Sequence, residues 1–195
     1  MSWRSMAATV RGQLESPGGA QVERALKRAA RDLCRRTGVL VEELAALDAV
    51  AGEVTYAVAA STGYELRRVK TVTLNGNEVD ASQWRYAAAV RSVVLSMAPA
   101  ADATGGLVVA AVVAPLVTIS ADLPAWFEER WGDVIEAGAL VRLMGQRRKA
   151  WFDADGAADA RSKWRAGESA ARRDVRAQGR DGTLAYAPPL SGGWK

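Results

Sequence analysis

The sequence predicts an α+β protein: a helical bundle, formed by a first helix and a C-terminal helical hairpin, with an inserted small antiparallel β-sheet or sandwich lobe and an extended C-terminal arm. Three observations predict this class. Apolar residues recur at helical spacing before residue 37 and again after residue 121. Between these stretches, short runs rich in β-branched and aromatic residues alternate with turn residues. The last residues of the chain show neither period.

The changes of pattern predict the bounds of each part. Residues 1–19 contain a Ser-Pro-Gly-Gly run and are predicted to form a flexible lead-in. A discontinuous helical domain is predicted over 20–37 and 121–179, with a β lobe over 38–120 inserted into it. Residues 180–195 are predicted to form the extended arm.

Three helices are predicted from the apolar spacing and from their stop signals. The first runs from Ala20 to Arg36 and ends at Gly38, because glycine readily adopts the left-handed conformation that closes a helix. The second runs from Pro124 to Gly145, with the proline near its first turn. The third runs from Ala157 to Gln178, with Gly179 as its stop.

The β lobe is predicted from short alternating runs and from one strong hairpin signal. Asn75-Gly76 predicts a tight turn, since Gly76 readily takes a positive φ. The predicted strands are Glu53–Ala59, Leu66–Leu74, Trp84–Tyr86, Ser92–Met97 and Leu107–Ile119.

The composition excludes several kinds of active site. The chain has no histidine, which excludes Ser-His-Asp and Cys-His nucleophiles and histidine metal sites. The single cysteine, Cys34, excludes a thiolate zinc site and is predicted to be a small core residue. No phosphate-binding glycine loop or nucleophile elbow is present. We therefore expect no enzymatic activity, no catalytic residue, no cofactor and no metal.

The longest apolar run, 107–119, contains Pro115 and is too short to span a bilayer. We therefore expect no membrane segment. An Asp-Ala-Asp-Gly run at 153–156 is similar to the start of a calcium loop, but its twelfth position is Trp164 where a glutamate is required. The better interpretation is that Asp153 or Asp155 caps the third helix.

Three carboxylates, Glu129, Asp133 and Glu136, share one predicted helix face at i, i+4 and i+7. Carboxylates so placed could hold a divalent metal, and a carboxylate-dependent hydrolase is the hypothesis that follows. A solvated face, or one that meets arginines of a neighbouring subunit, is favoured over it.

The net charge of +4 is unevenly distributed along the chain. Basic residues outnumber acidic ones up to residue 40, and acidic residues prevail between 41 and 120. The basic first helix suggests an alternative function, a nucleic-acid-binding or packaging-associated protein, and no helix-turn-helix pattern accompanies it. The other interpretation is a solvated helix surface with ion pairs such as Asp159–Lys163. The basic side chains that could contact phosphates are Arg28, Arg31, Arg35, Arg147, Arg148, Lys149, Arg161, Lys163, Arg165, Arg172, Arg173 and Arg176.

The predicted arm is too sparse in apolar residues to order itself. Full burial of a large apolar side chain contributes about 1.5–3 kcal/mol, whereas ordering each residue costs about 1–2 kcal/mol. The arm is therefore expected to dock on a neighbouring surface through multivalent contact or to remain a disordered terminus. The residues predicted to dock are Leu184, Tyr186, Pro188, Pro189, Leu190 and Trp194.

Three stretches carry a resemblance to a known family: VERALKRAARDLCRRTG, LPAWFEERWGDVIEAGALVRLMGQ, and the set Trp151, Asp153, Ala160 and Trp164. On these residues the chain resembles the head-to-tail adaptor (connector) proteins of tailed bacteriophages, and most closely the tail tubular protein A or gatekeeper type of short-tailed phages. The resemblance covers about residues 20 to 180. The Ala-rich β block and the Gly-Gly-Trp end depart from the family pattern.

The resemblance implies a structural virion protein at the head–tail interface, assembled in the host cytoplasm. It implies a homo-oligomeric ring, a dodecamer, that docks under the portal protein and links it to a tail nozzle or tail tube protein. Non-specific DNA passage through the lumen would follow, and the arm would dock on the portal or on a neighbour. The implied ring-packing helix residues are Trp126, Trp131, Ile135, Gly138 and Leu140, and the implied DNA-proximal or intersubunit charges are Arg28, Arg31, Arg35, Glu129, Asp133 and Glu136.

Overall fold

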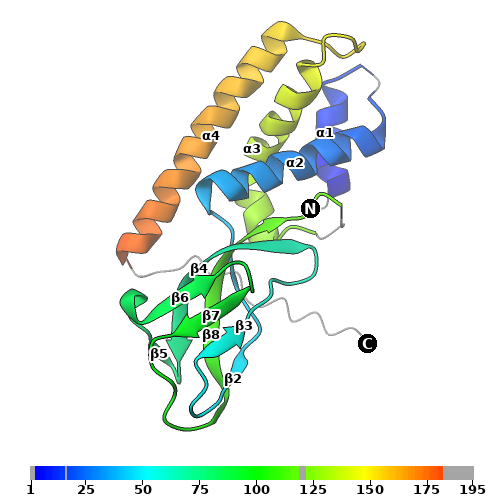
Figure 1. Ribbon diagram of the computed structural model, residues 1–195. Coiled ribbons are helices and arrows are strands. Elements are labelled where there is room, and N and C mark those ends of the chain that lie inside the picture. The colour runs from blue at the N-terminus through cyan, green and yellow to red at the C-terminus, as the bar shows by residue number, and fades with distance from the viewer. Residues whose placement is uncertain (1–2, 16, 119–121, 182–195) are drawn as a thin grey trace. The chain divides into compact units, whose positions relative to one another are not determined.

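A computed structural model describes residues 3–15, 17–118 and 122–181 of the chain (Figure 1). Over these residues the protein contains four α-helices and antiparallel β-sheets, so the predicted α+β class is confirmed. The described residues form two compact units. One lies within Met1–Leu40 and Ala114–Leu184 and is helical, and the other is the β unit Val41–Val113. None of the four described helices has the length and apolarity that crossing a bilayer requires.

The helical unit is built around one central helix. Its elements are α1 (Trp3–Gly12), α2 (Gly19–Thr37), α3 (Ala125–Met144) and α4 (Ala154–Asp181). Helix α3 contacts the other three, and α4 runs beside it along much of its length (Figure 1). The consecutive residues 137–140 of α3 are all buried, and together they span a full helical turn. The buried surface of α3 is therefore wider than the apolar stripe that the sequence predicts.

Helix α1 corrects the prediction of a flexible lead-in over residues 1–19. Trp3, Met6 and Val10 are 5%, 2% and 0% exposed, respectively, and they follow one another at i, i+3 and i+7. This spacing is the ordinary signal of a buried helix face. The prediction is wrong because it gave the Ser-Pro-Gly-Gly run more weight than this short apolar pattern.

The ends of the helices test the predicted stop and cap signals. Gly38 has a φ of +71°, and its N–H donates to the carbonyl of Cys34 at 2.8 Å, which confirms the predicted stop of α2. At the start of α4, the N–H groups of Asp155 and Gly156 donate to Asp153 Oδ1 at 3.1 and 2.9 Å. Capping by Asp153 is thus confirmed. The predicted stop at Gly179 is wrong, because α4 continues through it to Asp181.

The β unit contains two sheets that share one core. The first has the strand order β1-β8-β4-β5, with β2 also paired to β8, and the second has the order β3-β7-β6. Tyr56 and Val93 of the second sheet lie in the same apolar cluster as Val72, Leu107 and Val109 of the first. Of the two predicted forms, sheet or sandwich, the sandwich is therefore the one observed. The strands are β1 (Val41–Glu43), β2 (Leu47–Ala49), β3 (Thr55–Ala57), β4 (Tyr64–Leu74), β5 (Asn77–Glu78), β6 (Trp84–Ala87), β7 (Ser92–Leu95) and β8 (Ala103–Pro115).

The hairpin between β4 and β5 confirms the predicted turn. Asn75 and Gly76 have φ values of +51° and +80°, the combination that a type I′ turn requires. Strand β8 begins before the predicted Leu107, because Gly105 and Gly106 lie inside the strand and do not precede it. Strands β1 and β2 escaped the sequence analysis, because runs of three residues show almost no period.

The predicted arm lies almost wholly beyond the last described residue. Leu184, Tyr186, Pro188, Pro189, Leu190 and Trp194 are outside the described residues, so their docking role remains a prediction.

Candidate functional site

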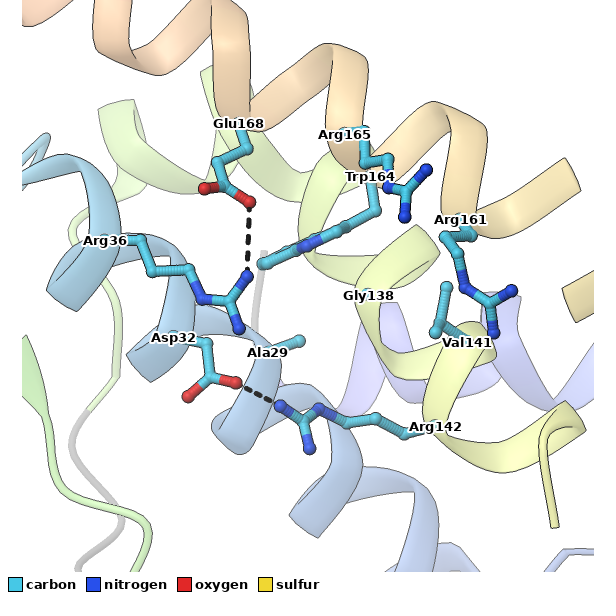
Figure 2. Close-up of a pocket in the computed structure, with 10 residues that line it drawn as sticks. All are labelled: Ala29, Asp32, Arg36, Gly138, Val141, Arg142, Arg161, Trp164, Arg165 and Glu168. Atoms are coloured by element: carbon cyan, nitrogen blue, oxygen red, sulfur yellow. Dashed lines mark hydrogen bonds and ion pairs between the residues drawn. The ribbon is translucent and has the colours of Figure 1, made fainter. Parts of the chain in front are cut away.

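Helices α2, α3 and α4 enclose a hollow of about 380 Å³ that we call the arginine groove (Figure 2). Its base is formed by small and apolar residues and by one indole ring. Its sides carry charged residues from all three helices. The lining residues are Ala29, Asp32 and Arg36 of α2, Gly138, Val141 and Arg142 of α3, and Arg161, Trp164, Arg165 and Glu168 of α4.

The base of the groove depends on the missing side chain of Gly138. A Cβ atom at this position would lie 2.6 Å from Cε3 and Cζ3 of Trp164 and 2.9 Å from the Cβ of Ala29. Carbon atoms normally approach no closer than about 3.5 Å. Glycine therefore lets the Trp164 indole of α4 lie directly against the backbone of α3, with α2 on the other side.

A second close approach joins α3 and α4 about one turn further along. A Cβ atom at Gly167 would overlap the side chain of Val134. Ala157, Ala160 and Ala171 are also buried, so these alanines, Trp164 and Gly167 follow one another along α4 at alternating spacings of three and four. Ala160 was named in the resembling set, whereas Gly167 was not predicted to make a contact. The available signal was a glycine seven residues after Ala160, inside a predicted helix.

Ion pairs engage only part of the charge on the sides of the groove. Arg142 pairs with Asp32, which joins α3 to α2. Glu168 of α4 accepts from Arg36 Nη1 at 3.5 Å and from Arg172 Nη2 at 2.5 Å. One carboxylate thus serves two guanidinium groups, so this part of the groove keeps an excess of positive charge.

Arg161 and Arg165 carry most of the remaining positive charge. Both side chains are exposed, and neither makes a hydrogen bond or an ion pair within residues 3–15, 17–118 and 122–181. Figure 2 shows the two guanidinium groups extending from α4 on the same side as Trp164 and Val141. Four arginines face two carboxylates in the groove, so it attracts anions.

A second hollow, of about 610 Å³, adjoins the arginine groove and shares Arg142 with it. Arg24 and Arg28 of α2 line this hollow together with Gln146, and none of its lining residues in the described part of the chain is a carboxylate. Of the charges that the sequence analysis singled out on α2, only Arg28 lies here. Arg31 is half-buried and Arg35 is exposed, and both interact elsewhere in the chain.

The three predicted carboxylates of α3 do not converge. Asp133 and Glu136 line a separate hollow of about 380 Å³, whose lining does not include Glu129. Burial, with a smaller contribution from Asp133, raises the pKa of Glu136 above its ordinary value, while a hydrogen bond with Thr9 opposes the shift. Within the described residues no three His, Cys, Asp or Glu side chains are grouped so as to hold a metal ion.

The implied ring-packing residues of α3 lie mostly in the core of this chain's own helical unit. Trp131, Ile135 and Leu140 are 5%, 0% and 7% exposed, and Gly138 is covered by Trp164. Trp126 is only half-buried and packs edge-to-face on Phe127, with ring centroids 5.5 Å apart. Trp126 is therefore the residue of this set best placed to reach another subunit. A contact of any of them with a neighbour remains a prediction.

Cys34 occupies the position that the sequence predicts. Its side chain is 0% exposed on the inner face of α2, so the predicted core role is confirmed. Burial raises the pKa of the thiol far above its ordinary value, which leaves almost no reactive thiolate at neutral pH.

A comparison with protein families finds no family model that matches the chain, and a comparison with curated proteins finds no match. The groups that the arginine groove presents are guanidiniums, carboxylates engaged in ion pairs, and one indole ring. Guanidinium groups bind phosphates and carboxylates but do not release protons at neutral pH, so the groove is suited to binding anions.

Proposed function

We propose that the protein is a structural virion component, a head-to-tail adaptor of a tailed bacteriophage. Copies of the chain would form a homo-oligomeric ring, a dodecamer by analogy with the family it resembles, between the portal protein and the tail nozzle or tail tube. DNA would pass through the lumen of this ring. The proposal assigns no catalytic chemistry to the chain.

The observation that carries the proposal is the placement of the three resembling stretches. They fall in α2, in α3 and at the start of α4, which belong to one helical unit. The whole β unit is inserted in the sequence between α2 and α3. This order of elements is the one that the resemblance implies. A helical scaffold that carries an inserted lobe also presents two chemically different surfaces to its neighbours.

Charge distribution supports contacts between unlike surfaces of successive copies. The sequence is basic up to residue 40 and acidic between 41 and 120. The N-terminal part of the helical unit therefore carries a net positive charge, and the β unit carries a net negative charge. A ring requires heterologous contacts, in which one patch of a subunit meets a different patch of the next. Opposite charges on two patches favour that head-to-tail pairing over self-pairing of either patch.

The proposal is tested by mixing the purified protein with the portal protein of the same virus. Light scattering during gel filtration measures the mass of each species, and negative-stain electron microscopy shows its shape. We expect rings of the protein alone, or additional density that caps one end of the portal. A protein that stays monomeric and leaves the portal unchanged would overturn the proposal.

The predicted arm is tested in the same assay by replacing residues 183–195 with a Gly-Ser segment of equal length. Helix α4 ends at Asp181, so the replacement leaves every described element intact. We expect weaker portal capping and an unchanged melting temperature. Portal capping that survives at full strength would refute the docking role of the arm.

A further inference from the structure

We propose that the arginine groove and the adjoining hollow form a binding site for the phosphodiester backbone of nucleic acid that does not read base sequence. The inference goes beyond the adaptor role, because it assigns a ligand to one surface of the helical unit whatever the chain assembles with.

The arginine groove contains positive charge that no carboxylate neutralises within the described residues. Arg161 and Arg165 make no hydrogen bond or ion pair among the described residues, although Asp32 and Glu168 line the same groove. Those two carboxylates are already engaged, Asp32 by Arg142 and Glu168 by Arg36 and Arg172. An incoming phosphate therefore meets guanidinium groups whose donors are free, and guanidinium is the side chain best suited to bidentate phosphate contact.

The positively charged surface extends beyond the groove. The adjoining hollow adds Arg24 and Arg28, and it shares Arg142 with the groove. Among the described residues, no carboxylate lines this hollow. Arginines from α2, α3 and α4 thus line a surface that extends from the arginine groove into the adjoining hollow. A small anion would use one of them, whereas a polyanion with regularly spaced phosphates can engage several at once.

The base of the groove is rigid because Trp164 packs against the backbone of α3 at Gly138. Arg161 and Arg165 leave α4 three residues before Trp164 and one residue after it. The helix holds both arginines at constant spacing, so binding orders only their side chains. Contacts between arginines and phosphates position a nucleic acid without specifying its sequence.

The test compares two double variants on the same helix. Arg161→Gln with Arg165→Gln removes the two uncommitted arginines of the groove. Arg173→Gln with Arg176→Gln removes the same charge from exposed positions of α4 that line neither hollow. Circular dichroism and the melting temperature confirm the fold of each. Fluorescence anisotropy with a labelled 25-base-pair duplex, and with one of its strands alone, measures binding from 0.05 to 0.3 M salt.

We expect the groove variant to lose about two phosphate contacts, which lowers the slope of log K against log salt by about 1.8 on the duplex. Because this electrostatic contribution vanishes near 1 M salt, the loss corresponds to roughly 60-fold weaker binding at 0.1 M salt. The control variant should change binding several-fold less. Equal losses in both variants would mean that net charge alone drives binding, and this result would overturn the site. The site would also be overturned if the wild type showed no measurable binding to the duplex or to the single strand.

A gain of binding provides an independent test of the same groove. Asp32→Asn releases Arg142 from its ion pair, so DNA affinity and the salt slope should both rise. Asp159→Asn makes the same charge change in a different hollow, where Asp159 pairs with Lys163 at 2.8 Å, and should leave binding unchanged. Poly-glutamate at equal charge serves as competitor. Displacement of the duplex at equal or lower concentration would indicate an acidic polypeptide as the occupant and would refute the assignment.

The readout is separate from that of the adaptor proposal. DNA binding is measured on the protein without portal, and portal capping is measured without DNA. Loss of one result therefore leaves the other standing.

Discussion

The contact between Gly138 and Trp164 makes the sharpest prediction about this fold. Replacing Gly138 with alanine adds one methyl group to the middle of α3. That methyl would lie 2.6 Å from two ring carbons of Trp164 and 2.9 Å from the Cβ of Ala29. Each of these distances is roughly 1 Å shorter than an ordinary carbon contact. To admit the methyl, the Trp164 ring and the Cβ of Ala29 must both move away from Gly138.

Two opposing effects set the size of the change. Alanine is favoured over glycine inside a helix by about 1 kcal/mol. Overpacking a well-filled core costs about 1–3 kcal/mol. We expect the upper end of that range, about 3 kcal/mol, because three atoms on two different helices crowd the new methyl. The net loss in the free energy of unfolding is then about 2 kcal/mol.

Gly132 supplies the matched control on the same helix. A Cβ atom there meets nothing within 4 Å, so Gly132→Ala should keep the helix-propensity gain and stabilise the protein by about 1 kcal/mol. The two variants should therefore differ by about 3 kcal/mol. At about 2–4 °C per kcal/mol for a chain of this size, the melting temperatures should differ by roughly 6–12 °C.

Equilibrium urea unfolding followed by circular dichroism measures both free energies, and thermal scans check them. A third variant, Trp164→Leu, removes the ring atoms that the methyl would meet. In that background Gly138→Ala should be close to neutral, and the double-mutant cycle should return a coupling of about 2 kcal/mol. Equal effects of Gly138→Ala and Gly132→Ala in the wild-type background would refute the packing of Trp164 on α3.

Three further predictions address single groups. Because the pKa of Glu136 is raised in the folded protein, the folded state favours the protonated form, and stability is lost as the pH rises through that raised pKa. Glu136→Gln should therefore raise the melting temperature at pH 7 and leave it nearly unchanged at pH 4. The buried Cys34 thiol should resist alkylation by iodoacetamide at pH 8 in the folded protein and react fully in urea, so rapid modification of the native state would contradict its burial. Asp153→Ala should cost about 1 kcal/mol because two N–H groups lose their acceptor, while Asp155→Ala should cost less than half of that in the same urea assay.

Local signals account for the parts of the fold that the sequence predicts well. The positive φ of Gly38, the cap formed by Asp153 and the turn at Asn75-Gly76 each depend on residues within four positions of one another. Such signals are strong because they reflect the conformational preferences of a few adjacent residues. Helix α1 has an equally local pattern, Trp3, Met6 and Val10. It was not predicted because the Ser-Pro-Gly-Gly run that follows it indicated a flexible segment.

Burial around α3 could not be predicted in the same way. Its residues 137–140 are buried on every side because three helices surround it, and no periodicity in one segment reveals how many partners that segment has. Gly167 shows the same limit. Its role depends on Val134, which lies on another helix and more than thirty positions earlier in the chain.

The candidate site likewise has features that the sequence shows and features that depend on the tertiary structure. The sequence by itself determined that the chain has no histidine, one buried cysteine, an α+β order of elements and many arginines on helical segments. Only the tertiary structure decided which arginines meet. Four arginines converge because small residues let α4 lie close against α3 while α2 packs on both: Arg36, Arg142, Arg161 and Arg165. Asp32 and Glu168 then neutralise some of these guanidinium groups and leave the others free. Charge along a chain is additive and can be read from the sequence, whereas the field in a groove depends on distances between helices that only packing sets.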